Sequence, residues 1–268
     1  MRLAALQYSG SGDIVVYAIL GGISAHFGLC TGLGATTLLR PLLDAVSSLP
    51  PQSLFLLSTM ATLSAALVSA FFALSSPLPL HQDELLLLAC GSALGGFLGD
   101  LASNRFIAML MPETAMLLQN GLLFTLVALP AIYFKTLSSV IRPLSLTRLC
   151  ALPVSLLTGL IASFLAFGAE PVTLLVYYLL FDAEDDESAA AALTVALFAM
   201  AGKLITQLVR LRLNLPDADI LLWLLPGTLI GAAAAMFPAF RGRLPRKGDL
   251  LLRMSLFTAL INIAAAIA

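Results

Sequence analysis

Apolar residues fill eight long stretches of the chain, and most of the charged residues lie in the short segments between them. A helix needs about 20 apolar residues to cross a hydrocarbon core of about 30 Å, and most of the stretches have this length. The pattern predicts an all-α polytopic membrane protein. The stretches cover residues 14–46, 52–74, 84–103, 115–134, 149–181, 188–209, 219–240 and 249–267.

Two of the stretches, 14–46 and 149–181, are too long for a single span. As one straight helix, the segment 151–181 would extend about 46 Å, half as long again as the hydrocarbon core. We therefore expect two broken helices, with pieces over 14–29 and 34–46 and over 149–167 and 169–181. The residues that favour the breaks are Gly28, Gly32, Gly34 and Pro41 in the first and Gly159, Gly168 and Pro171 in the second.

An internal repeat divides the chain into two halves. Gly34 and Gly168, at the two predicted breaks, are 134 residues apart. Each is followed by a short helix, an apolar run and a glycine-rich run, over 91–99 in the first half and 227–235 in the second. Duplicated membrane domains with matching broken helices are typical of secondary transporters, and we expect the repeat to be inverted. Within one membrane domain, the halves are residues 1–134 and 148–268, joined by a connector over 135–147.

The composition supports a membrane protein and restricts the classes of partner that it can bind. Only 11% of the residues are charged, against about 25% in a soluble domain. The outer surface must therefore contact membrane lipid. A net charge of −1 argues against nucleic acid as a partner. The three cysteines are far apart and form no CxxC motif, so we expect neither a disulfide framework nor a metal site, and no cofactor.

The two predicted breaks offer a binding site for a small anion. The start of a helix presents unpaired N–H groups and the positive end of the helix dipole, and glycine lets an anion approach the backbone. Two such starts, one from each half, could hold a small oxyanion near the middle of the membrane. The expected contacts are Gly32, Gly34, Ala35, Thr36 and Thr37 at the first break and Gly168, Ala169 and Glu170 at the second.

Four further residues are candidate substrate contacts, each with a structural alternative. Arg40 could attract the anion, or pair with Asp44 one helical turn later. Lys203 could contact the substrate, or extend its ammonium group to the membrane interface. Thr59 and Thr194 occupy matching places in the two halves, and their hydroxyls could bind substrate or bond to carbonyls of their own helices.

Glu170 is the only charged residue between Ala151 and Phe181. An ionisable residue inside a membrane domain is costly and is a functional hypothesis by default. Glu170 could take up and release a proton together with the anion. Alternatively, it could cap the helix that it begins or pair with Lys203. Both interpretations remain open at this stage.

Four segments, two in each half, resemble those of the TauE/SafE family of sulfite exporters. GLGATTLLRPLL and FGAEPVTLL are similar to the family's glycine-rich segments, which are followed by PL-type residues. GSALGGFLGDL and PGTLIGAAAAMFP are similar to its later glycine-rich elements. The resemblance implies transport of sulfite, sulfonates or related small anions across a bacterial inner membrane. The chain departs from the family at Glu170, where a carboxylate replaces a glycine and disfavours a bound anion unless it is protonated or paired.

Other functional classes fit the sequence less well. Intramembrane proteases need HExxH, GxGD or a histidine downstream of the serine; Asp100 lacks the first glycine of GxGD and no histidine follows His81. We therefore expect that the protein is not an enzyme. A non-transporting scaffold would not need two broken helices, while a transporter of a cation or another solute could use Glu170 as a ligand. Gly91, Gly95 and Gly99 permit close helix packing, within the chain or in a homodimer.

Overall fold

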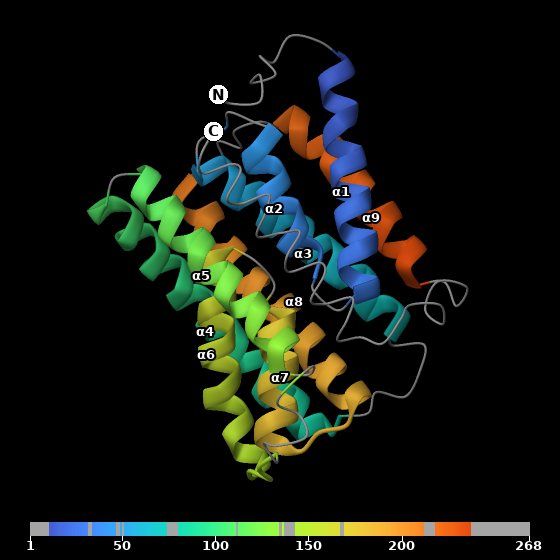
Figure 1. Ribbon diagram of the computed structural model, residues 1–268, viewed down its shortest axis with the longest axis vertical. Coiled ribbons are helices and arrows are strands. Elements are labelled where there is room, and N and C mark those ends of the chain that lie inside the picture. The colour runs from blue at the N-terminus through green and yellow to red at the C-terminus, as the bar shows by residue number, and fades with distance from the viewer. Residues whose placement is uncertain are drawn as a thin grey trace.

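The computed structural model of the protein describes residues 11–31, 34–46, 49, 51–73, 80–110, 112–133, 136, 143–166, 169–211 and 218–236. The regular elements in these ranges are helices, which confirms the predicted all-α fold (Figure 1). The predicted span over 249–267 lies outside the described residues. The helices are α1 (Ser11–Thr31), α2 (Ala35–Val46), α3 (Pro51–Ala73), α4 (Gln82–Met109), α5 (Pro112–Ile132), the 3-10 helix η2 (Arg148–Cys150), α6 (Ala151–Leu165), α7 (Glu170–Phe181), α8 (Asp185–Leu211) and α9 (Ala218–Met236).

Several helices have the dimensions of membrane spans. In the described ranges, five segments are long and apolar enough to cross a membrane, and two shorter apolar helices accompany them. The predicted stretches up to residue 236 correspond to helices of the structure, and 115–134 corresponds to α5, which is not among these segments. The helix α4 continues six residues beyond the expected end at 103, to Met109. The helix ends before Leu110, whose backbone is extended, two residues before Pro112 begins α5. The five segments are Ser53–Phe72, Gln82–Phe106, Arg148–Leu165, Asp186–Val209 and Asp219–Met236.

Both overlong stretches are broken where the sequence predicts. The first break separates α1 from α2, and Gly34 within it has a φ of +78° that favours glycine. The Gly34 N–H donates to the carbonyl of Gly28 over 3.1 Å, which closes the turn. The second break separates α6 from α7. There Ala166 (φ 53°) and Ala169 (φ 54°) adopt the left-handed conformation without being glycines, at a cost of about 1–2 kcal/mol each.

The helices form two bundles that exchange one helix each (Figure 1). The first bundle is α1, α2, α3 and α9, and its core brings together residues such as Tyr17, Leu39, Leu57 and Leu224. The second bundle is α4, α6, α7 and α8, with α5 beside α7. Thus α9, from late in the chain, completes the early bundle, and α4 completes the late one. The bundles contact each other through α3 and α8.

Glycines let the exchanged helices pack closely on the broken ones. A Cβ atom on Gly95 of α4 would lie 2.3 Å from the carbonyl oxygen of Leu156 on α6. A Cβ atom on Gly227 of α9 would lie 2.1 Å from the carbonyl oxygen of Ala18 on α1. These distances are too short for any side chain, so the glycines are required for the approach. The contacts that the glycine-rich runs make here lie within one chain.

Replacing Gly95 by leucine should separate α4 from α6 and lower the thermal unfolding temperature in detergent. Overpacking of this kind costs about 1–3 kcal/mol. The matched control is Gly121→Leu on α5, where an added Cβ atom meets nothing within 4 Å. Equal unfolding temperatures of the two variants would contradict the close packing of α4 on α6.

Candidate functional site

The two breaks meet at Gly34 and Glu170. Gly34 directly precedes α2, and Glu170 is the first residue of α7. A Cβ atom on Gly34 would lie 2.2 Å from Oε2 of Glu170 and 2.4 Å from its Oε1. The carboxyl group therefore lies against the Cα atom of Gly34, in the space that any other side chain would occupy. The starts of two short helices, one from each half of the chain, are thus adjacent.

The starts of α2 and α7 give this region a positive electrostatic character. The first N–H groups of each helix have no intrahelical partner, and both dipoles have their positive end here. The Oε2 atom of Glu170 is buried and accepts no hydrogen bond from the part of the chain that the structure describes. A buried polar atom without a partner costs about 1–3 kcal/mol. The site therefore holds an oxygen that a proton or a bound ligand can satisfy.

On the other side of the second break, the last turn of α6 is capped by three side chains from three helices. They are Arg40 from α2, Gln119 from α5 and Lys203 from α8. Their donors bond to carbonyls of this last turn, where a helix runs short of its own N–H donors. The carbonyl of Ser163 also accepts from the N–H of Ala166 over 3.2 Å. Lys203 Nζ donates to the carbonyl of Ser163, Gln119 Nε2 to that of Phe164 at 3.2 Å, and Arg40 Nη1 to that of Leu165.

The capping side chains form a buried charged cluster. Arg40 and Lys203 are 2% and 0% exposed, and their charged groups lie 4.5 Å and 5.2 Å from the ring centre of Phe55. The Lys203 ammonium is also 3.9 Å from the carboxylate of Asp100. Arg40 Nη2 donates to Oε1 of Gln119 over 3.2 Å. Cations are favourable at the negative end of a helix dipole, so the cluster stabilises the end of α6.

The structure describes the contacts of Lys203 and Arg40 and leaves their contact with substrate a prediction. The alternative in which Lys203 reaches the membrane interface is wrong, because its side chain is buried between helices. Its carboxylate partner in the described part of the chain is Asp100 rather than Glu170. Arg40 lies in the interior and bonds to α6 and α5. Both cations are therefore held near the second break by backbone carbonyls.

Thr59 and Thr194 bond to their own helices. The Thr59 hydroxyl donates to the carbonyl of Phe55 over 2.6 Å, and that of Thr194 to the carbonyl of Ala190 over 2.8 Å. These bonds correspond to the structural alternative for the two threonines. Each hydroxyl oxygen retains the capacity to accept a further bond.

The structure describes only some of the remaining residues that were predicted to contact the substrate. Ala169 is buried and directly precedes α7. The backbones of Ala35, Thr36 and Thr37 form the first turn of α2, and their side chains are outside the description. Gly32 and Gly168 lie outside the described residues.

Gln119 and Asp100 belong to the site region, and sequence reasoning did not assign them there. Asp100 was considered only as part of an incomplete protease motif. Gln119 lies in the apolar run 115–134, in which it and Asn120 are the only amide side chains. A polar side chain in a membrane span needs a partner, so Gln119 was a detectable signal. Its partner could not be read from the sequence, because the carbonyl of Phe164 is 45 residues away.

The model of a known protein family, described as Sulfite exporter TauE/SafE, matches residues 17–267. This is nearly the whole chain. The chain belongs to the TauE/SafE family. It is therefore a membrane transporter by family, and the broken helices and their buried polar side chains are part of a transport protein. No curated protein and no solved structure matches the chain.

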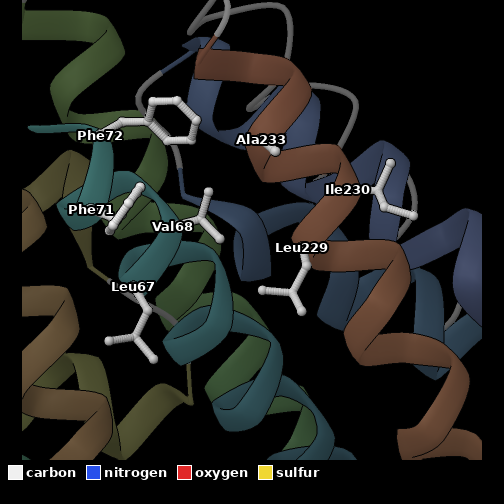
Figure 2. A pocket seen from close by; sticks show the side chains of 7 residues that line it. All are labelled: Leu67, Val68, Phe71, Phe72, Leu229, Ile230 and Ala233. Atoms are coloured by element: carbon white, nitrogen blue, oxygen red, sulfur yellow. The ribbon is translucent and has the colours of Figure 1, made fainter.

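A surface groove of this TauE/SafE protein lies between α3 and α9 (Figure 2). Its lining side chains are all apolar, and several of them, including Phe71 (71% exposed) and Ile230 (70% exposed), are open to the surroundings. The side chains that line the groove offer no hydrogen-bond donor for an anion. The lining residues are Leu67, Val68, Phe71, Phe72, Leu229, Ile230 and Ala233.

The contact between the breaks predicts the behaviour of Gly34→Ala. The added methyl group collides with the Glu170 carboxyl group. In addition, alanine at a positive φ lowers the stability of the fold by about 1–2 kcal/mol. We expect a lower thermal unfolding temperature, measured in detergent. Adding Glu170→Gly should restore the part of the loss that the collision causes and leave the backbone part. If Glu170→Gly gives no recovery in the Gly34→Ala background, the two residues do not touch.

The buried cluster predicts a coupled effect at Lys203. Lys203→Met removes the donor to Ser163 and leaves the Asp100 carboxylate buried without its cation, a change that costs about 3–5 kcal/mol. Asp100→Asn in the same chain should recover a large part of this loss, measured by thermal unfolding. Strictly additive effects of the two substitutions would show that Asp100 and Lys203 do not interact.

Proposed function

We propose that the protein is a secondary transporter of a small oxyanion, such as sulfite or a sulfonate, and that it binds this anion where α2 and α7 begin. The observation that supports the proposal is the contact between Gly34 and Glu170, which brings the two helix starts together. Broken helices that meet in this way bind anionic groups in secondary transporters through their amide ends. Membership of the TauE/SafE family supports the same substrate class.

The charges around the breaks favour an anion bound by backbone amides. The cationic groups of Arg40 and Lys203 donate to the carbonyl end of α6, so they stabilise the break. The amide ends of α2 and α7 then supply the donors for a substrate. Because Gly34 has no side chain, the anion can approach the start of α2 closely. The site suits a compact anionic group such as sulfite or the head of a sulfonate.

A transporter of a cation is the second candidate, since Glu170 supplies a buried oxygen without a hydrogen-bond partner in the described part of the chain. The dipoles of α2 and α7 oppose it, because both place their positive ends at this oxygen. The described residues also contain no group of three or more histidine, cysteine or acidic side chains that could hold a metal ion. The anion is therefore the stronger proposal.

The proposal extends to coupling, location and assembly. Glu170 exchanges a proton during transport, the protein acts in a bacterial inner membrane, and it carries out no catalysis. A homodimer remains a prediction. Glu170 supports proton coupling because it is the only charged residue of α6 and α7.

Flux into reconstituted vesicles tests the proposed function. Vesicles that contain the purified protein should accumulate sulfite or methanesulfonate faster than protein-free vesicles. Gly34→Leu should abolish this flux, because the side chain fills the site, while Gly121→Leu on α5 should retain it. Uptake of sodium or potassium without any anion flux would contradict the proposal.

A further inference from the structure

We infer that the carboxylate of Glu170 is a built-in competitor of the substrate anion. In its ionised form it occupies the start of α2, and the substrate binds there only after Glu170 has been protonated and has withdrawn. Each anion would then bind together with one proton. This inference rests on the proposed anion site and specifies how that site is regulated.

The position of the carboxyl group supports competition. Both of its oxygens and its Cδ atom lie within 2.4 Å of the place where a Cβ atom on Gly34 would be. Gly34 directly precedes the twelve residues of α2, so the carboxyl group lies at the amide end of that helix. A carboxylate is itself a small planar oxyanion. It therefore occupies the region in which the dipole of α2 favours a substrate of the same charge.

The surroundings of the carboxyl group support its displacement by a ligand. Oε2 is buried and has no hydrogen-bond partner in the described part of the structure. An ionised carboxylate in such a place needs donors, and a second anion beside it would be repelled. A proton on Glu170 removes both difficulties, because it neutralises the carboxyl group and leaves the positive helix end to the substrate.

The sum of the buried charges also changes in favour of a bound anion when Glu170 takes up a proton. Arg40 and Lys203 contribute two positive charges and Asp100 one negative charge around the end of α6. An ionised Glu170 makes these four groups neutral. A protonated Glu170 leaves one positive charge, which a bound monoanion balances.

The helices packed around the two starts carry few other titratable groups. Neither α3 nor α6 contains a charged residue, α5 has Glu113 in its first turn, and α7 has the phenols of Tyr177 and Tyr178. On the other helices, the groups within the membrane stretches near the breaks are His26 and Cys30 on α1, Arg40 and Asp44 on α2, Asp100 on α4 and Lys203 on α8. His26 and Lys203 are the rivals for a pH-dependent role, and substitution of Glu170 separates Glu170 from both.

Calorimetric titration of the purified full-length protein with methanesulfonate tests the inference, since the charge of this probe does not change across the working pH range. For the unaltered protein, we expect Kd to rise by up to tenfold per pH unit over the range in which Glu170 ionises. Binding should take up about one proton per anion, measured by comparing buffers with different ionisation enthalpies. Glu170→Gln should bind with a Kd that is independent of pH and lower than that of the unaltered protein at high pH.

Matched variants make the outcome decisive. His26→Gln and the exposed Glu184→Gln should keep the pH dependence of the unaltered protein, and Glu170→Gly should replace Glu170→Gln if the latter does not fold. The inference is overturned if Glu170→Gln retains the pH dependence, if it binds methanesulfonate more weakly at every pH, or if His26→Gln removes the dependence instead. If neither the unaltered protein nor any variant binds methanesulfonate, sulfite or thiosulfate, both the proposed anion site and the proposed competition are wrong. If the unaltered protein and the Glu170 variants bind methanesulfonate equally well at every pH, the anion site is supported and only the competition is refuted.

Flux in vesicles provides an independent readout. A monoanion that moves with one proton carries no net charge, so flux through the unaltered protein should not respond to an imposed membrane potential. Flux through Glu170→Gln should respond to the potential, because the anion moves alone. A voltage response of equal size in both proteins would contradict the inference.

Discussion

A helix interrupted inside a membrane must have its free backbone groups satisfied by the protein, because the hydrocarbon offers no partners. The end of α6 shows how this protein meets the requirement. The carbonyls of its last turn, from Ser163 to Leu165, accept hydrogen bonds from side chains on three other helices. One of these donors, Arg40, belongs to the first bundle, so the same bonds that stabilise the break also connect the two bundles.

This arrangement places cationic side chains on one side of the second break and the carboxyl group of Glu170 on the other. Cationic side chains satisfy the carbonyl end of α6, and that end is therefore not available to a coupling cation. The amide end of α7 faces the start of α2, where the ligand is a carboxylate of the protein itself. The proposed anion site and the side chains that cap α6 thus lie on opposite sides of the same break. In the first break, by contrast, the backbone closes the turn through Gly34 and Gly28.

The breaks could be predicted because they follow from length and local chemistry. Two apolar stretches exceed the membrane thickness, and glycine and proline mark where each must be interrupted. The left-handed conformations of Ala166 and Ala169 could not be predicted, because alanine rarely adopts a positive φ. The sequence also predicted that the two helix starts share one site, but not which of their residues touch. The contact between Gly34 and Glu170 depends on how the halves pack.

Long-range packing also explains the other differences. Arg40 bonds to a carbonyl 125 residues away, which no local pattern indicates. The sequence showed that Lys203 lies in an apolar run, but not that Asp100 lies beside it. The exchange of α4 and α9 between the bundles was likewise hidden, since small residues permit close packing without naming the partner helix.

The most direct test of the central claim is anomalous diffraction from crystals grown at acidic pH with selenite, the heavier analogue of sulfite. The account predicts a selenium peak between the start of α2 and the start of α7, with the Glu170 carboxyl group displaced from Gly34. A selenium peak elsewhere in the protein, with Glu170 still in contact with Gly34, would contradict it.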